Sequence, residues 1–464
     1  MPVSRNTVRV PLILLLILLA VFLPLIASGY AELEKARAAT SYTEAAEHYR
    51  MAAQRLPWRA DLYELSGHAY YHAEEYARAD AAYQKAFQHG AFSPEGWVAW
   101  GDVNYLKDDP QRATEIWEQA LEQEHVSEHL YSRLAEIYQN RGEISKAAET
   151  LQKYVSLHQE DPSARYHLGL LLTLLEPDRA LTELLSAAQL DPQLDPAVQT
   201  LRTALSLAAL EESASSRSLV IGRGLGLVSE WKLARLAFEE AVHLDDENAE
   251  AWAWLGEAKY QTGLRAEGNA EFERALKLNA NSATVRGLRG LYLQRIGNFR
   301  EALTEFEAAA RLEPDNPTWQ VSIGESHAKL GDLIQSLNSY QTATTLAPDD
   351  PGYWRLLAVF CAQNNVNVKD VGVPAAQKAV VLDGEDANSM DVLGWLLTLD
   401  ARHAEAKRTL NRALELDPQN ASAHMHLGML YLQMNDRASA YDHLVQARDL
   451  GSREAEVILN QYFP

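Results

Sequence analysis

The sequence predicts an all-α solenoid of about 11–12 helix-turn-helix repeats, preceded by one N-terminal transmembrane helix. Three observations support this fold class: a residue pattern that returns with a fixed period of about 34 residues, small residues that keep the same register, and one long apolar segment near the N-terminus. A fixed period of this length is typical of stacked helical repeats, in which neighbouring units bury each other's apolar faces and share one continuous core.

The first expected element is the apolar segment from Val10 to Ala27, which contains no charged residue. At about 1.5 Å per helical residue it would span roughly 27 Å, close to the thickness of the hydrocarbon core of a bilayer. We therefore expect a membrane anchor over residues 10–28, behind a short basic tail of residues 1–9. The alternative is a cleaved signal peptide, although the apolar core of a signal peptide usually has only about 7–15 residues.

The charges that flank this segment predict its orientation. Arg5 and Arg9 precede it without any acidic residue, whereas both signs of charge follow it. The positive-inside rule then favours a single-pass protein with a cytoplasmic N-terminus and an exported repeat domain, either periplasmic or extracellular. Because lysine and arginine are equally numerous on the two sides, a cytoplasmic repeat domain is the alternative.

The repeats follow the anchor, and their pattern is a triplet of small, bulky and small residues such as Ala234, Phe238 and Ala241. Of the eleven intervals between twelve such triplets, eight are identical in length. Another small residue, often glycine, stands twelve positions before most triplets, as Gly222 does here. We expect two helices per unit that approach closely at the small residues, while the bulky residues fill the space between units.

This pattern resembles the tetratricopeptide repeat, whose W-x-x-L-G-x-x-Y, A-x-x-x-F and P positions recur with the same period. Residues 251–281, AWAWLGEAKYQTGLRAEGNAEFERALKLNAN, carry the likeness most clearly, with Gly268 in place of the usual alanine. The likeness extends from Tyr30 to Ser452. It implies a right-handed α-solenoid whose usual role is protein–protein interaction without catalysis.

The spacing of the triplets also predicts the domain organisation. One interval, from Ala180 to Ala234, exceeds the common period by enough to hold an additional helix within residues 195–212, before a polar stretch. We expect a first repeat block at 30–192, an extra helix with a polar linker at 193–217, a second block at 218–452 and a capping helix at 453–464. The alternative to the linker is a degenerate repeat that stacks like the others.

Composition excludes several classes of function. The chain holds 42 basic and 64 acidic residues, a formal net charge of −22, so it should repel nucleic acid. Cys361 is the only cysteine, which excludes a disulfide framework and CxxC motifs. His68 and His72 have helical spacing but no further ligand cluster near them, so we expect no metal and no cofactor. The expected elements leave no segment for a catalytic domain, so we expect no catalytic residues and no enzyme.

The resemblance implies that the first helix of each repeat lines a concave groove that holds a segment of another protein. The side chains that it places on this face are Asp61, Glu64, His68, Glu95, Asp102, Arg133, Glu136, Glu250, Trp254, Glu257, Glu325, Arg355, Asp391 and Trp395. Because acidic residues dominate this set, we expect a protein or peptide partner that is basic or rich in aromatic residues.

These implications favour a membrane-anchored, non-catalytic scaffold that assembles or positions partner proteins through its groove. The alternative is an accessory subunit that modulates an envelope enzyme, or a secretion or glycosyltransferase machinery, in trans.

Overall fold

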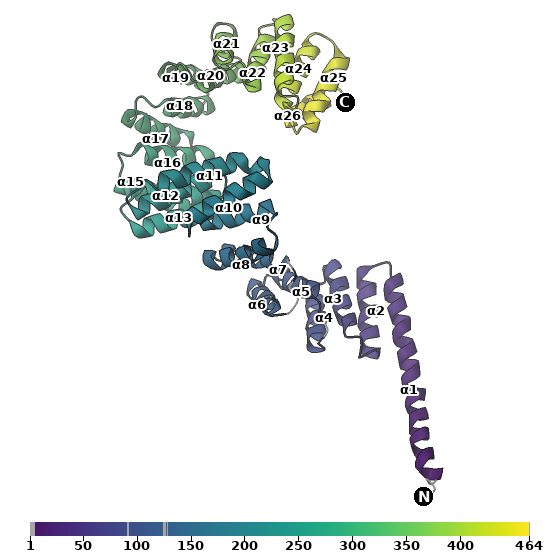
Figure 1. Ribbon diagram of the computed structural model, residues 1–464. Helices are drawn as coiled ribbons and strands as arrows, with labels where there is room; N and C mark the ends of the chain where they lie inside the picture. The colour runs from purple at the N-terminus through teal and green to yellow at the C-terminus, as the bar shows by residue number, and fades with distance from the viewer. Residues whose placement is uncertain (1–4, 91, 124–126, 128, 464) are drawn as a thin grey trace. The chain divides into compact units, whose positions relative to one another are not determined.

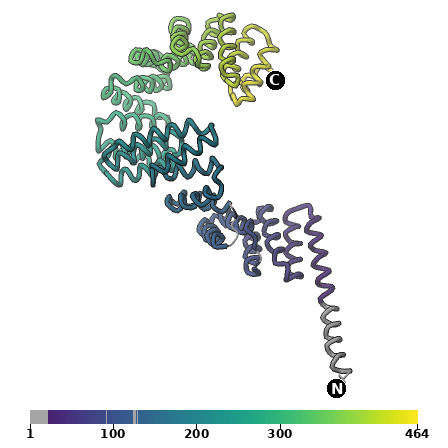
Figure 2. Tube along the Cα trace, viewed as in Figure 1, coloured from purple at the N-terminus to yellow at the C-terminus, as the bar shows by residue number. Residues whose placement is uncertain are grey.

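The computed structural model describes the backbone of residues 5–90, 92–123, 127 and 129–463, and the side chains from residue 22 onward within these ranges (Figures 1 and 2). All regular elements of the described residues are helices. The chain forms two compact units, Met1–Leu210 and Glu211–Pro464. The prediction of an all-α repeat architecture is confirmed.

In the first unit each repeat is a pair of helices that pack on one another, and the pairs stack in chain order. Its elements are α1 (Arg5–Ala38), α2 (Tyr42–Arg55), α3 (Asp61–His72), α4 (Tyr76–Gln88), α5 (Pro94–Leu106), α6 (Pro110–Leu121), α7 (His129–Asn140), α8 (Ile144–Leu157), α9 (Pro162–Leu172), α10 (Pro177–Leu190), the 3-10 helix η1 (Pro192–Leu194) and α11 (Asp195–Ala208).

The second unit repeats the same arrangement and ends on a single helix. Its elements are α12 (Ala214–Leu227), α13 (Trp231–Leu244), α14 (Ala249–Gln261), α15 (Arg265–Leu278), α16 (Ala283–Arg295), α17 (Phe299–Leu312), α18 (Pro317–Lys329), α19 (Leu333–Leu346), α20 (Pro351–Asn364), the π-helix η2 (Val368–Gly372), α21 (Val373–Leu382), α22 (Ala387–Leu399), α23 (His403–Leu416), α24 (Ala421–Gln433), α25 (Arg437–Asp449) and α26 (Arg453–Tyr462).

The residues just before the first helix of a repeat determine where that helix begins. Ser93 precedes α5, and its hydroxyl accepts a hydrogen bond from the amide of Gly96; Asn248 caps α14 in the same way through Ala251. Such side chains satisfy amides that have no partner within the helix. Proline often follows the cap, as Pro94 does, because the first helical position needs no N–H donor.

The glycine that recurs in the first helices makes room for the bulky residue of the triplet. A Cβ atom on Gly222 would lie 2.5 Å from Cε1 of Phe238, and one on Gly290 would lie 2.6 Å from Cε1 of Phe306. Both phenylalanine side chains are fully buried. The close helix approach predicted from the spacing is therefore present within the repeats.

The region between the two blocks differs from the prediction at its C-terminal end. The extra helix is present as α11, which buries Val198, Leu201 and Leu205. The polar linker expected up to residue 217 is shorter, because Ser213 caps α12 and residues 214–217 form the first turn of that helix. Serine is polar enough for a loop, but it is also among the preferred residues at a helix start.

The expected anchor and the expected cap lie at opposite ends of the chain. Residues 1–4 and the side chains before Phe22 are outside the described part. Over the part that is described, no helix combines the length and the apolar character needed to cross a membrane. At the other end, α26 lies where the capping helix was expected and packs Ala455 and Leu459 against Leu444.

Candidate interaction grooves

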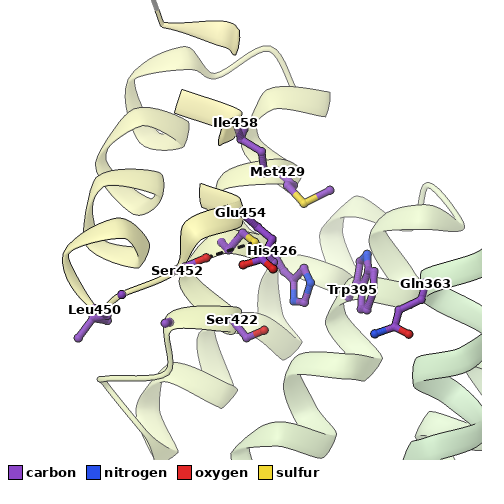
Figure 3. Close-up of a pocket in the computed structure, with 12 residues that line it drawn as sticks. Gln363, Trp395, Ser422, His426, Met429, Leu450, Ser452, Glu454 and Ile458 are labelled. Atoms are coloured by element: carbon purple, nitrogen blue, oxygen red, sulfur yellow. Dashed lines mark hydrogen bonds between the residues drawn. The ribbon is translucent and has the colours of Figure 1, made fainter. Parts of the chain in front are cut away.

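A groove of about 670 Å³ lies near the C-terminal end of the second unit, where α22, α24 and α26 contribute most of its lining (Figure 3). Its walls are about equally polar and apolar: Trp395, Met425, Met429 and Ile458 supply apolar surface, and Glu454 is an exposed carboxylate among the polar groups. Its lining residues are Gln363, Trp395, Ala421, Ser422, Met425, His426, Met429, Leu450, Gly451, Ser452, Glu454 and Ile458. We call this the C-terminal groove.

Trp395 and His426 form one wall of the C-terminal groove. Their rings stack with centroids 4.5 Å apart and an angle of 14° between the planes. Nδ1 of His426 lies 2.7 Å from Oδ1 of Asp391, and the side chains of both these residues are buried. Asp391 therefore fixes the imidazole ring, and the imidazole in turn supports one face of the indole ring, which is only half-buried.

A second cavity of about 600 Å³ borders the C-terminal groove, and the two share Gln363. It is lined by Gln294, Arg295, Phe299, Glu325, Ala328, Lys329, Tyr340, Leu356, Val359, Phe360, Gln363 and Asn364. Glu325 is exposed and accepts a hydrogen bond from Gln294 at 3.2 Å. The two cavities follow one another along the first helices, which is the arrangement that an extended segment requires.

The first unit has a smaller pocket that contains an ion pair, which we call the Asp102 pocket. It measures about 240 Å³ and is lined by Tyr71, Asp102, Tyr105, Leu106, Trp117, Arg133, Glu136 and Ile137. Arg133 donates two hydrogen bonds to the Asp102 carboxylate, at 2.9 and 3.3 Å. Burial nevertheless raises the pKa of Asp102, because it outweighs the attraction of Arg133. The structure thus brings together three predicted site residues: Asp102, Arg133 and Glu136.

Three predicted groove acids hold neighbouring repeats together instead. Glu257 is buried and accepts bonds at 2.5 and 2.6 Å from Nη1 of Arg295, on the next first helix. Asp391 is buried against His426. Glu64 is also buried, and accepts bonds from the amide and hydroxyl of Ser93. Their charges are not available to a partner in the way an exposed carboxylate is.

Hydrogen bonds to Glu64 also perturb its titration. Burial favours the neutral form of this carboxyl, but His68 and Ser93 together outweigh burial and lower its pKa. His68 itself lies half-buried, with Nε2 3.4 Å from Oε1 of Glu64. In addition, His68 lines a separate cavity of about 580 Å³ near the start of the first unit.

The other predicted residues differ in whether their side chains are bonded within the protein or exposed to solvent. Asp61 accepts two bonds from Arg59, at 2.8 and 2.7 Å. Arg355 is bonded to Asp386, and Glu250 accepts a bond from Ser282 at 3.2 Å. Of these residues, Asp61, Arg355 and Glu250 were predicted to line the groove, whereas their partners were not. Glu95 and Glu136 are exposed.

Trp254 contrasts with Trp395, although both were predicted to face a partner. Its ring stacks on Phe238 with centroids 5.9 Å apart, and the guanidinium carbon of Arg223 lies 5.5 Å from the ring centroid. The indole Nε1 is buried, with no hydrogen-bond partner among the described residues. Both indoles stack on one aromatic ring, but Arg223 also lies over Trp254, whereas Trp395 lines an open cavity.

Most of the C-terminal groove is not predicted by the charged and aromatic residues of the sequence. Met425, Met429, Ile458 and Gln363 line it without belonging to either class. A signal was present in the sequence: Met429 follows Gly428 just as Trp395 follows Gly394. Methionine is flexible and polarisable, and it adapts to varied apolar ligands.

The described residues contain no group of three or more histidine, cysteine or acidic side chains able to hold a metal ion. Cys361 is fully buried, and burial raises the pKa of its thiol to about 11. A thiol in this environment is protonated and inert near neutral pH.

Comparison with solved structures finds protein chains that align at low sequence identity and with TM-scores below 0.5. The Cut9 subunit complex, described as "APC/C hetero-tetramer Cut9-Hcn1", aligns at 15% identity over 97% of this chain and 98% of that chain, with a TM-score of 0.45. Yeast Tom70 aligns at 16% identity over 96% and 95%, with a TM-score of 0.42. A tetratricopeptide repeat protein from Parabacteroides merdae aligns at 13% identity over 53% and 96%, also with a TM-score of 0.42.

The sequence comparisons give two results. No curated protein matches the chain. The family described as tetratricopeptide repeat matches residues 132–196, 228–285, 288–351 and 400–450, which together make up just over half of the sequence. The helix pairs, the glycine contacts and this match agree, and the chain belongs to the tetratricopeptide repeat family.

Proposed function

We propose that the protein is a membrane-anchored, non-catalytic scaffold that holds segments of partner proteins in the grooves of its repeats. The observation that carries this proposal is the C-terminal groove: an open cavity of about 670 Å³ with Trp395 on one wall and both apolar and polar side chains around it. A partly buried tryptophan in a concave site is the kind of residue that dominates the binding energy of protein interfaces.

The contacts of the predicted acids change the expected chemistry of the partner. Because Glu257 and Asp391 are buried and bonded within the repeats, they contribute little charge to a ligand in the second unit. The C-terminal groove instead suits a segment with aromatic or aliphatic side chains. A basic partner fits better near the first unit, where Glu95 and Glu136 are exposed.

We also propose that residues 10–28 anchor the protein and that the repeats are exported. The support comes from the apolar sequence of this segment and from the last residues before the repeats, where Phe22, Leu23 and Leu25 are each about half-exposed on α1. Apolar side chains grouped in this way need cover from lipid or from another protein. Protease accessibility of the repeats in intact cells and in membrane vesicles tests the orientation.

Site-specific crosslinking tests the scaffold. We would introduce a photoreactive amino acid at Met429 in the C-terminal groove and, as a matched control, at Val381 on α21. Val381 is 78% exposed and does not line the groove. We expect a defined set of adducts from position 429 and few from position 381. Equal patterns from both positions would contradict binding in the groove, whereas a single enzyme captured at 429 would favour the accessory-subunit alternative.

A further inference from the structure

The helix that carries the apolar segment continues without a break into the first repeat. α1 runs from Arg5 to Ala38, and its C-terminal half packs on α2 (Figure 1). Ile26 and Leu33 of α1 belong to one apolar cluster with Leu56, which directly follows α2. Contact with the repeat therefore extends to Ile26, one residue before the apolar segment ends.

Close packing at Gly29 fixes the distance between the helices. A Cβ atom at this position would lie 2.6 Å from Cγ of Leu56, so only glycine allows the observed approach. Nη1 of Arg55 lies 3.4 Å from the carbonyl oxygen of Ser28, which ties the end of α2 to the same level of α1. The corner between α2 and α3 is thus held opposite residues 26–29.

A buried carboxylate fixes the rotation of α1 against α2. Glu32 accepts hydrogen bonds from Arg55 at 3.0 Å and from Lys35 at 3.1 Å, and its second oxygen lies 2.6 Å from Nδ1 of His48. Burial opposes ionisation of Glu32, but these three partners outweigh it and lower its pKa to about 2. At neutral pH the carboxylate is therefore charged and bonded to both helices, which leaves no flexible joint between the apolar segment and the repeat.

The α2–α3 corner carries the residue types that favour a membrane–water interface. Trp58 at the corner is 55% exposed, and Tyr30, one turn after the apolar segment, is 45% exposed. Tryptophan and tyrosine are enriched at the headgroup level of membranes because their rings are apolar and their N–H or O–H groups are polar. The nearby charges are already paired, Arg55 with Glu32 and Arg59 with Asp61.

We propose that Tyr30, Trp58 and Arg59 form a collar that lies in the headgroup region of the phospholipid bilayer, so that the first repeat stands directly on the membrane. This inference rests on the proposed anchor at residues 10–28. Because Arg59 and Arg55 are paired within the protein, the collar uses aromatic rings rather than net positive charge and does not depend on anionic lipid. The collar would hold the first repeats at a fixed height above the lipid.

Depth-dependent quenching tests the collar in the full-length chain, reconstituted in phosphatidylcholine vesicles. A Cys361→Ala background removes the only cysteine, and an environment-sensitive fluorophore is attached to Trp58→Cys or to Tyr42→Cys. Tyr42 is a matched control because it is 59% exposed and begins α2, whereas Trp58 lies beyond the other end of this helix. The length of α2 separates the two ends by about 20 Å.

We expect lipid with a spin label near the headgroup to quench roughly half of the fluorescence at position 58 and almost none at position 42. Quenching at a second labelled position, Tyr30→Cys, checks the result if the Trp58 variant folds poorly. A chain that floats with vesicles but shows no quenching at 58 and 30 would overturn the collar and leave the anchor intact. A chain that does not float would overturn the anchor and the collar together.

Discussion

The Asp102 pocket and the C-terminal groove, one in each unit, are built on the same helix positions but differ in size and in the residues that line them. The Asp102 pocket of the first unit measures about 240 Å³, and its carboxylate faces Arg133. The C-terminal groove of the second unit measures about 670 Å³, and Trp395 and Met429 line it. Both Asp102 and Trp395 directly follow the recurring glycine of a first helix. The repeat therefore fixes which position faces the groove, while the residue and its neighbours decide whether that position is free to bind.

The buried acids show the same contrast between the units. In the first unit Glu64 is held mainly by the neutral amide and hydroxyl of Ser93, with His68 nearby. In the second unit Glu257 is held by the charged guanidinium of Arg295. A carboxylate bonded to a neutral donor already makes charge-assisted hydrogen bonds, and a charged donor adds the attraction of an opposite charge. The Glu257–Arg295 contact should therefore stabilise its two repeats more than the Glu64–Ser93 contact does.

The largest effect is expected from Glu257→Ala. This change removes the hydrogen bonds that Glu257 accepts from Arg295 and Gln261 and should lower the local free energy of unfolding by about 2 kcal/mol, since the exposed Arg295 guanidinium can be hydrated. Hydrogen exchange measured on peptides from α14 and α16 in the full chain would report this loss. Glu250→Ala on the same helix is the control, because Glu250 accepts a single bond from Ser282. Equal exchange in both variants would show that Glu257 does not stabilise the contact between α14 and α16.

The next effect concerns binding and separates the two tryptophans. Peptides selected for binding to the full chain should lose about tenfold or more in affinity to Trp395→Ala, equivalent to about 1.4 kcal/mol, because a groove wall is removed. Trp254→Ala should change affinity by less than about twofold, since Arg223 and Phe238 already cover that ring. The affinities can be measured by titration calorimetry. A similar loss in both variants would mean that the groove extends over Trp254.

Much of the fold follows from the sequence, because the fixed register of the repeats specifies helix pairs, close glycine contacts and the groove-facing positions. The pairing of the groove acids does not follow from it. Glu64–Ser93, Glu257–Arg295 and Asp391–His426 join residues 29, 38 and 35 positions apart, close to one repeat length. The sequence thus shows that a donor stands about one repeat away from each acid. Only side-chain geometry decides whether the two groups meet or remain in solvent.

Ser93→Ala should have a smaller effect in the first unit. It removes the hydroxyl that bonds Glu64 and also caps α5, so the local stability should fall by about 1–2 kcal/mol. Because the fold lowers the pKa of Glu64, the part of this contribution that depends on its carboxylate is complete above the ordinary carboxyl pKa of 4.5 and is lost as the pH falls through the lower pKa of the folded chain. Exchange of α3 and α5 peptides over a series of pH values from 7 down to well below 4.5 would measure this loss. Ser132→Ala, at an exposed site in α7, is the control and should have little effect at any of these pH values.

The smallest effect, and the one with the opposite sign, is expected from Asp102→Asn. Burial raises the pKa of Asp102 in the folded chain, so ionisation costs more in the fold than in the unfolded chain. The carboxyl group therefore favours folding most when it is protonated, and this advantage is lost as the pH rises through its folded pKa. At neutral pH the asparagine variant should equal or exceed the native protein in local stability, by less than about 1 kcal/mol because Arg133 loses a charged partner.

The pH dependence of this difference provides the test. The advantage of Asp102→Asn should vanish as the pH falls below 3.8, the ordinary pKa of the side chain, since Asp102 is then neutral in both states. Asp61→Asn is the matched control of opposite sign: the hydrogen bonds from Arg59 lower the pKa of Asp61, so its replacement should destabilise the fold at neutral pH and matter less in acid. Hydrogen exchange of α3 and α5 peptides across this pH range would measure both. Asp102→Asn could instead destabilise α5 at neutral pH, just as Asp61→Asn is expected to destabilise α3. That result would mean that the bond from Arg133 stabilises the Asp102 carboxylate by more than its burial costs. The Asp102 pocket would then be a structural ion pair rather than a carboxylate held ready for a partner.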